Sequence, residues 1–147
     1  MKKVLLLFIS IGLLSLVAML LANDKGTYKV IVNAANPTSV ISREKLSKFF
    51  LKKLTKWDNG REVHPIDLVD NSRVRKTFTK EIHKKRVWNI RAYWQNQIFT
   101  GRRVPPPELT NEKDVVMIVE KDSLAIGYVS ASLPIDSSKI KVLTIKE

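Results

Sequence analysis

The sequence predicts an α/β domain in which helices pack on a central sheet. Three observations lead to this prediction. Short apolar runs with strand character recur at 28–32, 66–69, 124–129 and 139–145. Segments with apolar residues at helical spacing lie between them, at 42–52, 73–86, 87–99 and 111–119. The chain has 147 residues, enough for one domain but not for two lobes of ordinary size.

The first 22 residues are predicted to lie outside this domain. Lys2 and Lys3 precede an apolar run from Val4 to Ala22. Such a run is either a secretory signal peptide or an uncleaved N-terminal membrane anchor. Ala22 suits cleavage because it is small, but Leu20 at the −3 position does not. Either alternative places the domain 23–147 outside the cytoplasm, in the periplasm or cell envelope. The absence of cysteine excludes a lipid-modified cysteine, disulfides and a thiolate metal site.

The first half of the domain has clear boundary signals. Residues 28–32 read as a buried strand, and Ser42 is placed to cap a basic helix over 42–52. After a second strand at 66–69, the next helix begins at Arg73 and carries Val74, Phe78 and Ile82 on one face.

The second half continues the alternation. A helix over 87–99 has Trp94 and Ile98 on its predicted buried stripe and ends near Gly101, which suits a left-handed residue. Thr110 or Asn111 caps the following helix. Gly127, inside the strand 124–129, indicates a close backbone approach. In the terminal strand 139–145, alternation predicts Ile140, Val142 and Thr144 on one side.

The charge of the domain is strongly positive. Without Lys2 and Lys3, 24 Lys and Arg stand against 14 Asp and Glu, a net charge of +10. This charge favours acidic partners such as phosphate-bearing molecules, anionic lipid headgroups or an acidic protein. Export makes nucleic acid an unexpected partner.

The junction after the second strand is the predicted functional site. Asp70, Asn71 and Ser72 are turn and N-cap residues, and a strand that opens into a helix presents unpaired backbone N–H groups to an anion. Arg73 and Arg75 stand in the first helical turn, where the helix dipole disfavours a cation, so an acidic partner nearby would relieve the conflict. The alternative is that both arginines face solvent and Ser72 only caps the helix.

Three segments in this order resemble the phosphate-binding proteins of bacterial ABC transporters, which have the type II periplasmic binding fold. They are Phe49–Trp57, the turn Asp70–Asn71–Ser72, and Ala125–Val129. The stretch from Phe99 to Pro106 is similar to short, single-domain members of the superfamily. Because that family has two lobes, the resemblance implies a single lobe with a central sheet flanked by helices.

The family's binding loop reads Arg-x-Asp-Gly-Ser-Gly-Thr, and this chain matches it only in part. Asp70 and Ser72 agree, whereas Leu68 replaces the arginine, Asn71 and Arg73 replace the glycines, and Val74 replaces the threonine. The resemblance implies that Asp70 accepts a hydrogen bond from a protonated phosphate oxygen, while Ser72 and the N–H groups from Asn71 to Val74 coordinate the anion. Arg73 and Arg75 would balance its charge.

Two functions follow from these residues. The first is a solute-binding-like protein that holds phosphate or another oxyanion, with an envelope protein or a second copy completing the enclosure. The alternative is an interaction module without ligand, whose helix 42–53 and Arg102–Arg103 loop dock on an acidic envelope partner or an anionic membrane. An enzyme is not expected, because His64 and His83 are the only histidines and no carboxylate set accompanies them. For the same reason neither a metal nor a cofactor is expected.

Overall fold

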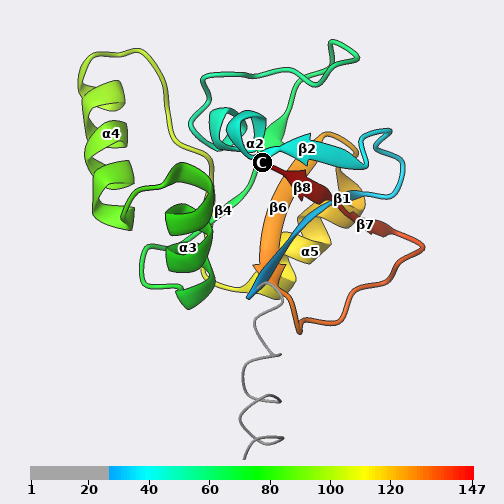
Figure 1. Ribbon diagram of the computed structural model, residues 1–147. Helices are drawn as coiled ribbons and strands as arrows, with labels where there is room; N and C mark the ends of the chain where they lie inside the picture. Colours follow the sequence, from blue (N-terminus) through cyan, green and yellow to red (C-terminus); the bar gives the residue numbers. More distant parts are fainter. Residues whose placement is uncertain (1–26) are drawn as a thin grey trace, which may run out of the picture.

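The computed structural model describes residues 27–147. The predicted signal peptide or anchor at 1–22 therefore lies outside the described residues. Within residues 27–147, no helix combines the length and apolar character needed to cross a bilayer. The described chain is a mixed α/β domain with a central sheet between helices, which confirms the predicted fold class (Figure 1).

The central sheet has four strands in the order β3-β6-β1-β7. β1 (Tyr28–Asn33) pairs antiparallel with β6 (Ala125–Ser130) on one side and with β7 (Ile140–Val142) on the other. β3 (His64–Pro65) adds to the free side of β6 in parallel. Two short parallel pairs lie outside this sheet. They join β2 (Val40–Ser42) to β8 (Thr144–Lys146) and β4 (Asp67–Leu68) to β5 (Glu108–Leu109).

Helices cover both faces of the sheet, and neighbouring residues of β6 show how. A Cβ added at Gly127 would lie 2.5 Å from Cγ1 of Val115, so this face of β6 lies directly on α5 (Glu112–Lys121). The ring of Tyr128 faces the other way and stacks on Phe78 with ring centroids 3.8 Å apart. Phe78 ends α3 (Arg73–Phe78), and Phe50, at the end of α2 (Arg43–Phe50), packs on the same two rings.

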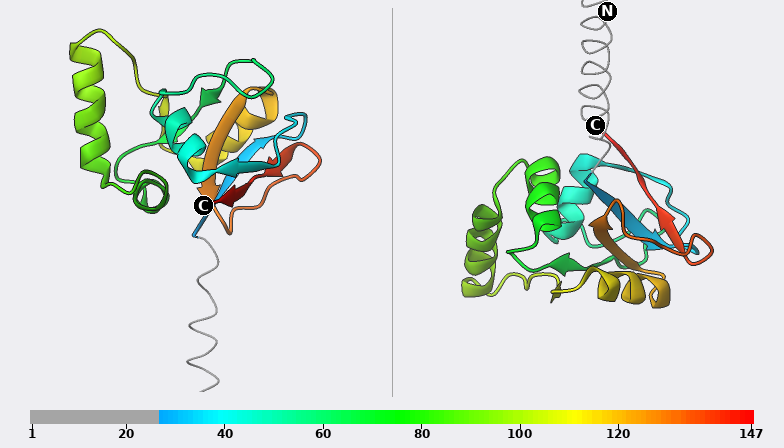
Figure 2. Two further views of the ribbon diagram at one scale, coloured as in Figure 1. Left: turned by 45° about the horizontal axis from the view of Figure 1, so that its top comes forward. Right: turned by 90° about the horizontal axis from the view of Figure 1, so that it is seen from below.

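The remaining helices extend the molecule away from the sheet. α3 continues into the π-helix η1 (Thr79–His83), and α4 (Val87–Phe99) follows. α4 lies at the outer edge of the molecule, on the side away from β7 and α5 (Figures 1 and 2). Its buried residues Ile90 and Trp94 pack with Leu51 in a small cluster separate from the main core.

Several local predictions are confirmed. Ser42 caps α2 by accepting from the N–H of Lys45 at 3.2 Å, and Asn111 caps α5 in the same way. Gly101 has φ +64°, as expected after a helix end. The close approach at Gly127 is the one that the sequence indicated.

Three predictions need correction. The single strand at 66–69 is two short strands in different sheets, β3 and β4, with Ile66 at the break between them. The terminal strand also divides, because the chain leaves β1 after Val142 and pairs with β2 from Thr144. Leu143 is therefore buried and Val142 is 45% exposed, the reverse of the expected alternation. Ile98 is 54% exposed rather than part of the buried stripe of α4.

Candidate functional site

The predicted strand–turn–helix junction is present around Asp70. The chain turns at Asp70 and Asn71, and the N–H of Ser72 donates to the carbonyl of Val69 at 3.0 Å. The hydroxyl of Ser72 accepts from the N–H of Arg75 at 3.2 Å and so caps α3, as expected. The N–H groups of the first two helical residues, Arg73 and Val74, have no intrahelical acceptor by the geometry of an α-helix.

Arg75 lies inside the protein, with 1% of its surface exposed. Its Nη1 donates to the carbonyl oxygen of Leu68 and to Oε1 of Glu108, the latter at 2.6 Å. Two aspartates complete its surroundings. Nη1 lies 3.1 Å from Oδ1 of Asp70, and Nη2 lies 3.5 Å from Oδ2 of Asp67. The sequence indicated that a first-turn cation would need an acidic partner, and Arg75 has three.

Asp67 forms the buried end of this charge cluster. It accepts hydrogen bonds from the hydroxyl of Tyr128 and, at 2.8 Å, from the N–H of Leu68. Burial raises the pKa of Asp67, and the charge of Arg75 and the bond from Tyr128 oppose that shift. Burial lowers the pKa of Arg75, but Asp67 and Glu108 outweigh it, so the pKa is raised and Arg75 stays charged.

Asp70 forms the outer end of the cluster and is half-buried. Besides Arg75, it pairs with Arg91 of α4, whose side chain is 63% exposed. A cavity of about 530 Å³ opens at this point. Its lining residues come from the turn, from α4 and from β5 with the residue that follows it: Val69, Asp70, Asn71, Arg91, Glu108 and Thr110.

The five predicted site residues therefore take different places. Asp70 and Asn71 line the cavity, whereas Ser72 uses its hydroxyl for the helix cap and Arg75 lies behind Asp70 in the interior. Arg73 is exposed in the same turn but is not part of the cavity lining. Sequence reasoning missed Arg91 and Glu108 because each lies far along the chain from the turn, and no local pattern joins them to it.

The two histidines occupy unrelated positions. Nδ1 of His83 lies 2.8 Å from the hydroxyl of Ser47, and burial followed by the charges of Arg75 and Lys53 lowers its pKa to about 4. Nδ1 of His64, in β3, lies 2.7 Å from Oδ2 of Asp122. Within residues 27–147, no three His, Asp or Glu side chains are grouped as metal ligands would be.

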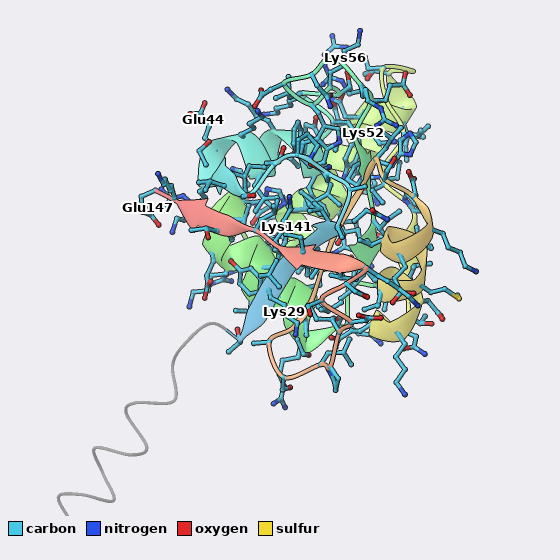
Figure 3. All side chains as sticks on the ribbon, turned by 90° about the vertical axis from the view of Figure 1, so that its right-hand side faces the viewer. Lys29, Glu44, Lys52, Lys56, Lys141 and Glu147 are labelled. Atoms are coloured by element: carbon cyan, nitrogen blue, oxygen red, sulfur yellow. The ribbon has the colours of Figure 1, made fainter. Side chains whose placement is uncertain are left out.

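The basic helix α2 has much of its charge matched by acidic residues. Arg43 pairs with Glu147, and Lys45 pairs with Asp58. Lys48 lies 2.6 Å from Glu44 one turn away. Figure 3 shows Glu147, at the end of β8, on the same side of the molecule as α2 and Glu44. This helix therefore presents less free positive charge than its sequence indicates.

The central sheet with helices on both faces has the fold of periplasmic-binding-protein-like domains. Three solved structures have this fold over most of the chain. A protein described as a phosphate ABC transporter substrate-binding protein with bound phosphate, from Clostridium perfringens, matches 81% of this chain with 17% identity and a TM-score of 0.63. An ABC-type phosphate transport receptor from Vibrio cholerae matches 81% with 18% identity and a TM-score of 0.62. PstS from Borrelia burgdorferi matches 81% with 12% identity and a TM-score of 0.62.

The likeness is one of fold and covers only part of each relative. The chain spans 44%, 46% and 47% of these three proteins, less than half of each. No protein-family model and no curated protein matches the sequence.

Proposed function

We propose that this is an exported solute-binding-like protein, not an enzyme, and that it binds phosphate or another small oxyanion in the cavity beside Asp70. One observation carries the proposal. Asp70, Asn71 and Arg91 line an open cavity at the start of α3, in a fold that this chain shares with phosphate-binding proteins. Export rests on Lys2 and Lys3 followed by the apolar run at 4–22.

The cavity offers both kinds of group that a phosphate needs. Arg91 supplies a guanidinium with charge-assisted donors, and the side chain of Asn71 adds an amide donor. The N–H groups of Arg73 and Val74 follow Asn71 and Ser72 at the positive end of the helix dipole, outside the cavity lining. Asp70 accepts a hydrogen bond from a protonated phosphate oxygen. Phosphate carries such a proton at neutral pH, whereas sulfate does not.

Arg75 has an indirect role in this proposal. It does not reach the ligand, but it compensates Asp67, Asp70 and Glu108 and thereby makes an anion tolerable beside two carboxylates. Ser72 holds the turn through its cap, and exposed Arg73 contributes long-range attraction.

The site is open to water, so the expected affinity is low. Electrostatic attraction is weaker where solvent screens the pair, and the chain spans less than half of the phosphate-binding proteins that it resembles. A second copy of the chain or an envelope protein would supply the missing wall and strengthen binding.

Calorimetric titration of the full chain in mild detergent with inorganic phosphate, at low salt, tests the proposal. We expect saturable binding at one site, weakened about tenfold or more by Arg91→Gln, because charge-assisted hydrogen bonds contribute about 1.5–3 kcal/mol. Arg61→Gln is the matched control. Arg61 is also exposed, but it bonds to Ser123 near the opposite end of β6.

Sulfate provides the second arm of this titration. The wild-type protein should prefer phosphate to sulfate, and Asp70→Asn should reduce that preference, because an amide can donate to a fully ionised oxyanion. A flat titration with phosphate, or equal affinities for the Arg91→Gln and Arg61→Gln variants, would refute the proposed site.

A further inference from the structure

The outer side of α4 exposes an unusual amount of apolar surface. Seven large hydrophobic residues are exposed within the described residues 27–147, and four of them lie between positions 88 and 104. They are Trp88, Ile98, Phe99 and Val104, exposed at 63%, 54%, 92% and 66%. Large aromatic side chains with this exposure are typical of contact surfaces rather than of a face that only meets water.

Trp88 and Phe99 lie on one side of this helix. They are eleven residues apart, which is three helical turns, or about 16 Å along the axis. Ala92 and Gln95 lie between them on the same exposed side. The opposite side of α4 packs against the rest of the domain, because Trp94 is 5% exposed and contacts Ile90 and Leu51.

The charge around this helix has one sign. Residues 82–107 contain no Asp or Glu and six basic residues. Three of these precede α4, one lies within it and two follow it: Lys84, Lys85, Arg86, Arg91, Arg102 and Arg103. A groove of about 700 Å³ at the start of α4 is lined by Lys80, Lys84, Lys85, Arg86, Trp88 and Asn89. Trp88 thus shares this groove with four basic side chains.

These cations are less compensated than those of α2. Among the described residues, no carboxylate lies within ion-pair distance of Lys84, Lys85 or Arg86. Arg91 is the exception on α4, since it pairs with Asp70. In the part of the chain that the structure describes, Lys84, Lys85 and Arg86 therefore carry unpaired positive charge beside Trp88.

We propose that the outer side of α4 and its basic ends, together the α4 face, bind the surface of an anionic phospholipid bilayer. The chemistry of the α4 face matches that surface in two ways. Lysines and arginines at both ends of α4 attract anionic headgroups. Trp88 and Phe99 provide aromatic side chains that enter the boundary between headgroups and acyl chains, as in interfacial helices.

The bilayer fits better than the other occupants. An acidic protein would match the charge but would not require a nearly fully exposed phenylalanine beside it. A second copy of this chain would place the six cations of its own residues 82–107 against the six of the first copy, and this repulsion is unfavourable. The α4 face is also separate from the oxyanion cavity, with which it shares only Arg91, so this inference does not depend on the proposed function.

Quenching of tryptophan fluorescence by brominated acyl chains tests the inference on the full chain. The chain has three tryptophans, and Trp57 and Trp94 are each 5% exposed, so quenching reports on Trp88. The protein is reconstituted into phosphatidylcholine vesicles with or without phosphatidylglycerol. We expect Trp88 to be quenched only when phosphatidylglycerol is present. Added inorganic phosphate should not release it, because a single free phosphate does not replace a charged surface.

A charge variant and a matched control distinguish binding through the α4 face from attraction of the whole basic domain to the bilayer. The variant Lys84→Gln/Lys85→Gln/Arg86→Gln should shift the equilibrium away from the bilayer by about fivefold for each charge removed. The control Lys113→Gln/Lys121→Gln/Lys146→Gln removes three exposed cations elsewhere and should leave quenching unchanged. Equal quenching in both kinds of vesicle, equal loss in the two variants, or release by inorganic phosphate would each overturn the proposal.

Discussion

Protonation of His83 should control how the stability of this domain depends on pH. The imidazole is half-buried, its Nδ1 lies 2.8 Å from the hydroxyl of Ser47, and the ring meets Phe78 edge-on at 5.7 Å between centroids. Burial, with the charges of Arg75 and Lys53, lowers its pKa from 6.5 to about 4. The folded state therefore holds this side chain neutral at a pH where the unfolded chain binds a proton.

The sign and size of the effect follow from that difference. Because the folded pKa is the lower one, the contribution of His83 to stability is fully present above pH 6.5 and is lost as the pH falls towards 4. Lowering the pKa of His83 from 6.5 to about 4 corresponds to at most about 3–4 kcal/mol, and the effect should be smaller than this because the side chain is not fully enclosed.

Urea unfolding followed by circular dichroism, repeated at intervals from pH 7.5 to 4, measures this contribution. The free energy of unfolding should fall steeply with acid in the wild-type protein and less steeply in His83→Gln, whose amide can still bond to Ser47. The matched control is His64→Gln, which should keep the slope that His83 causes. If His83→Gln and the wild-type protein show the same slope between pH 6.5 and 4, the argument for a neutral buried imidazole fails.

Three further predictions concern stability and can be measured by urea or thermal unfolding. Arg75→Met should lower the free energy of unfolding by about 3–5 kcal/mol, because Asp67 is then buried without its cation. The double variant Arg75→Met/Asp67→Leu should recover part of that loss. If it recovers none, the pairing of the two side chains is contradicted. Gly127→Ala should cost about 1–3 kcal/mol through overlap with Val115, and Gly127→Ala/Val115→Ala should be less affected than the sum of the single changes. Ser72→Ala should cost about 1 kcal/mol through the lost cap, whereas Thr77→Ala, whose hydroxyl bonds only within α3, should change stability less.

The elements that could be predicted from the sequence are those that depend on local patterns. α4 has the expected bounds, and Ser42 and Ser72 cap the helices that they were expected to cap. Each of these features is decided by residues within one or two turns of each other. Local spacing is enough to recognise them.

The features that could not be predicted depend on contacts between segments that are far apart in the sequence. Alternation along 139–145 assumes one sheet, but the chain moves from β1 to β2 near Leu143, and that step reverses which side chains face inward. Arg75 is buried because Asp67, Asp70 and Glu108 converge on it, and Glu108 is 33 positions away. The sequence around Arg75 indicates that an acidic partner is needed, but it does not identify the residue that provides it.

The pairing of β1 sets the order in which this chain can fold. Its two neighbours, β6 and β7, are both about a hundred residues further along the chain, and β8 is equally far from its partner β2. During synthesis the first strand therefore has no partner until most of the domain has emerged. Sheets closed by such distant segments form slowly, because the entropy of a long loop must be overcome before any strand pairing is gained. Until then, an apolar segment such as Val30–Val32 remains available to other chains, which makes the incompletely folded domain prone to aggregation.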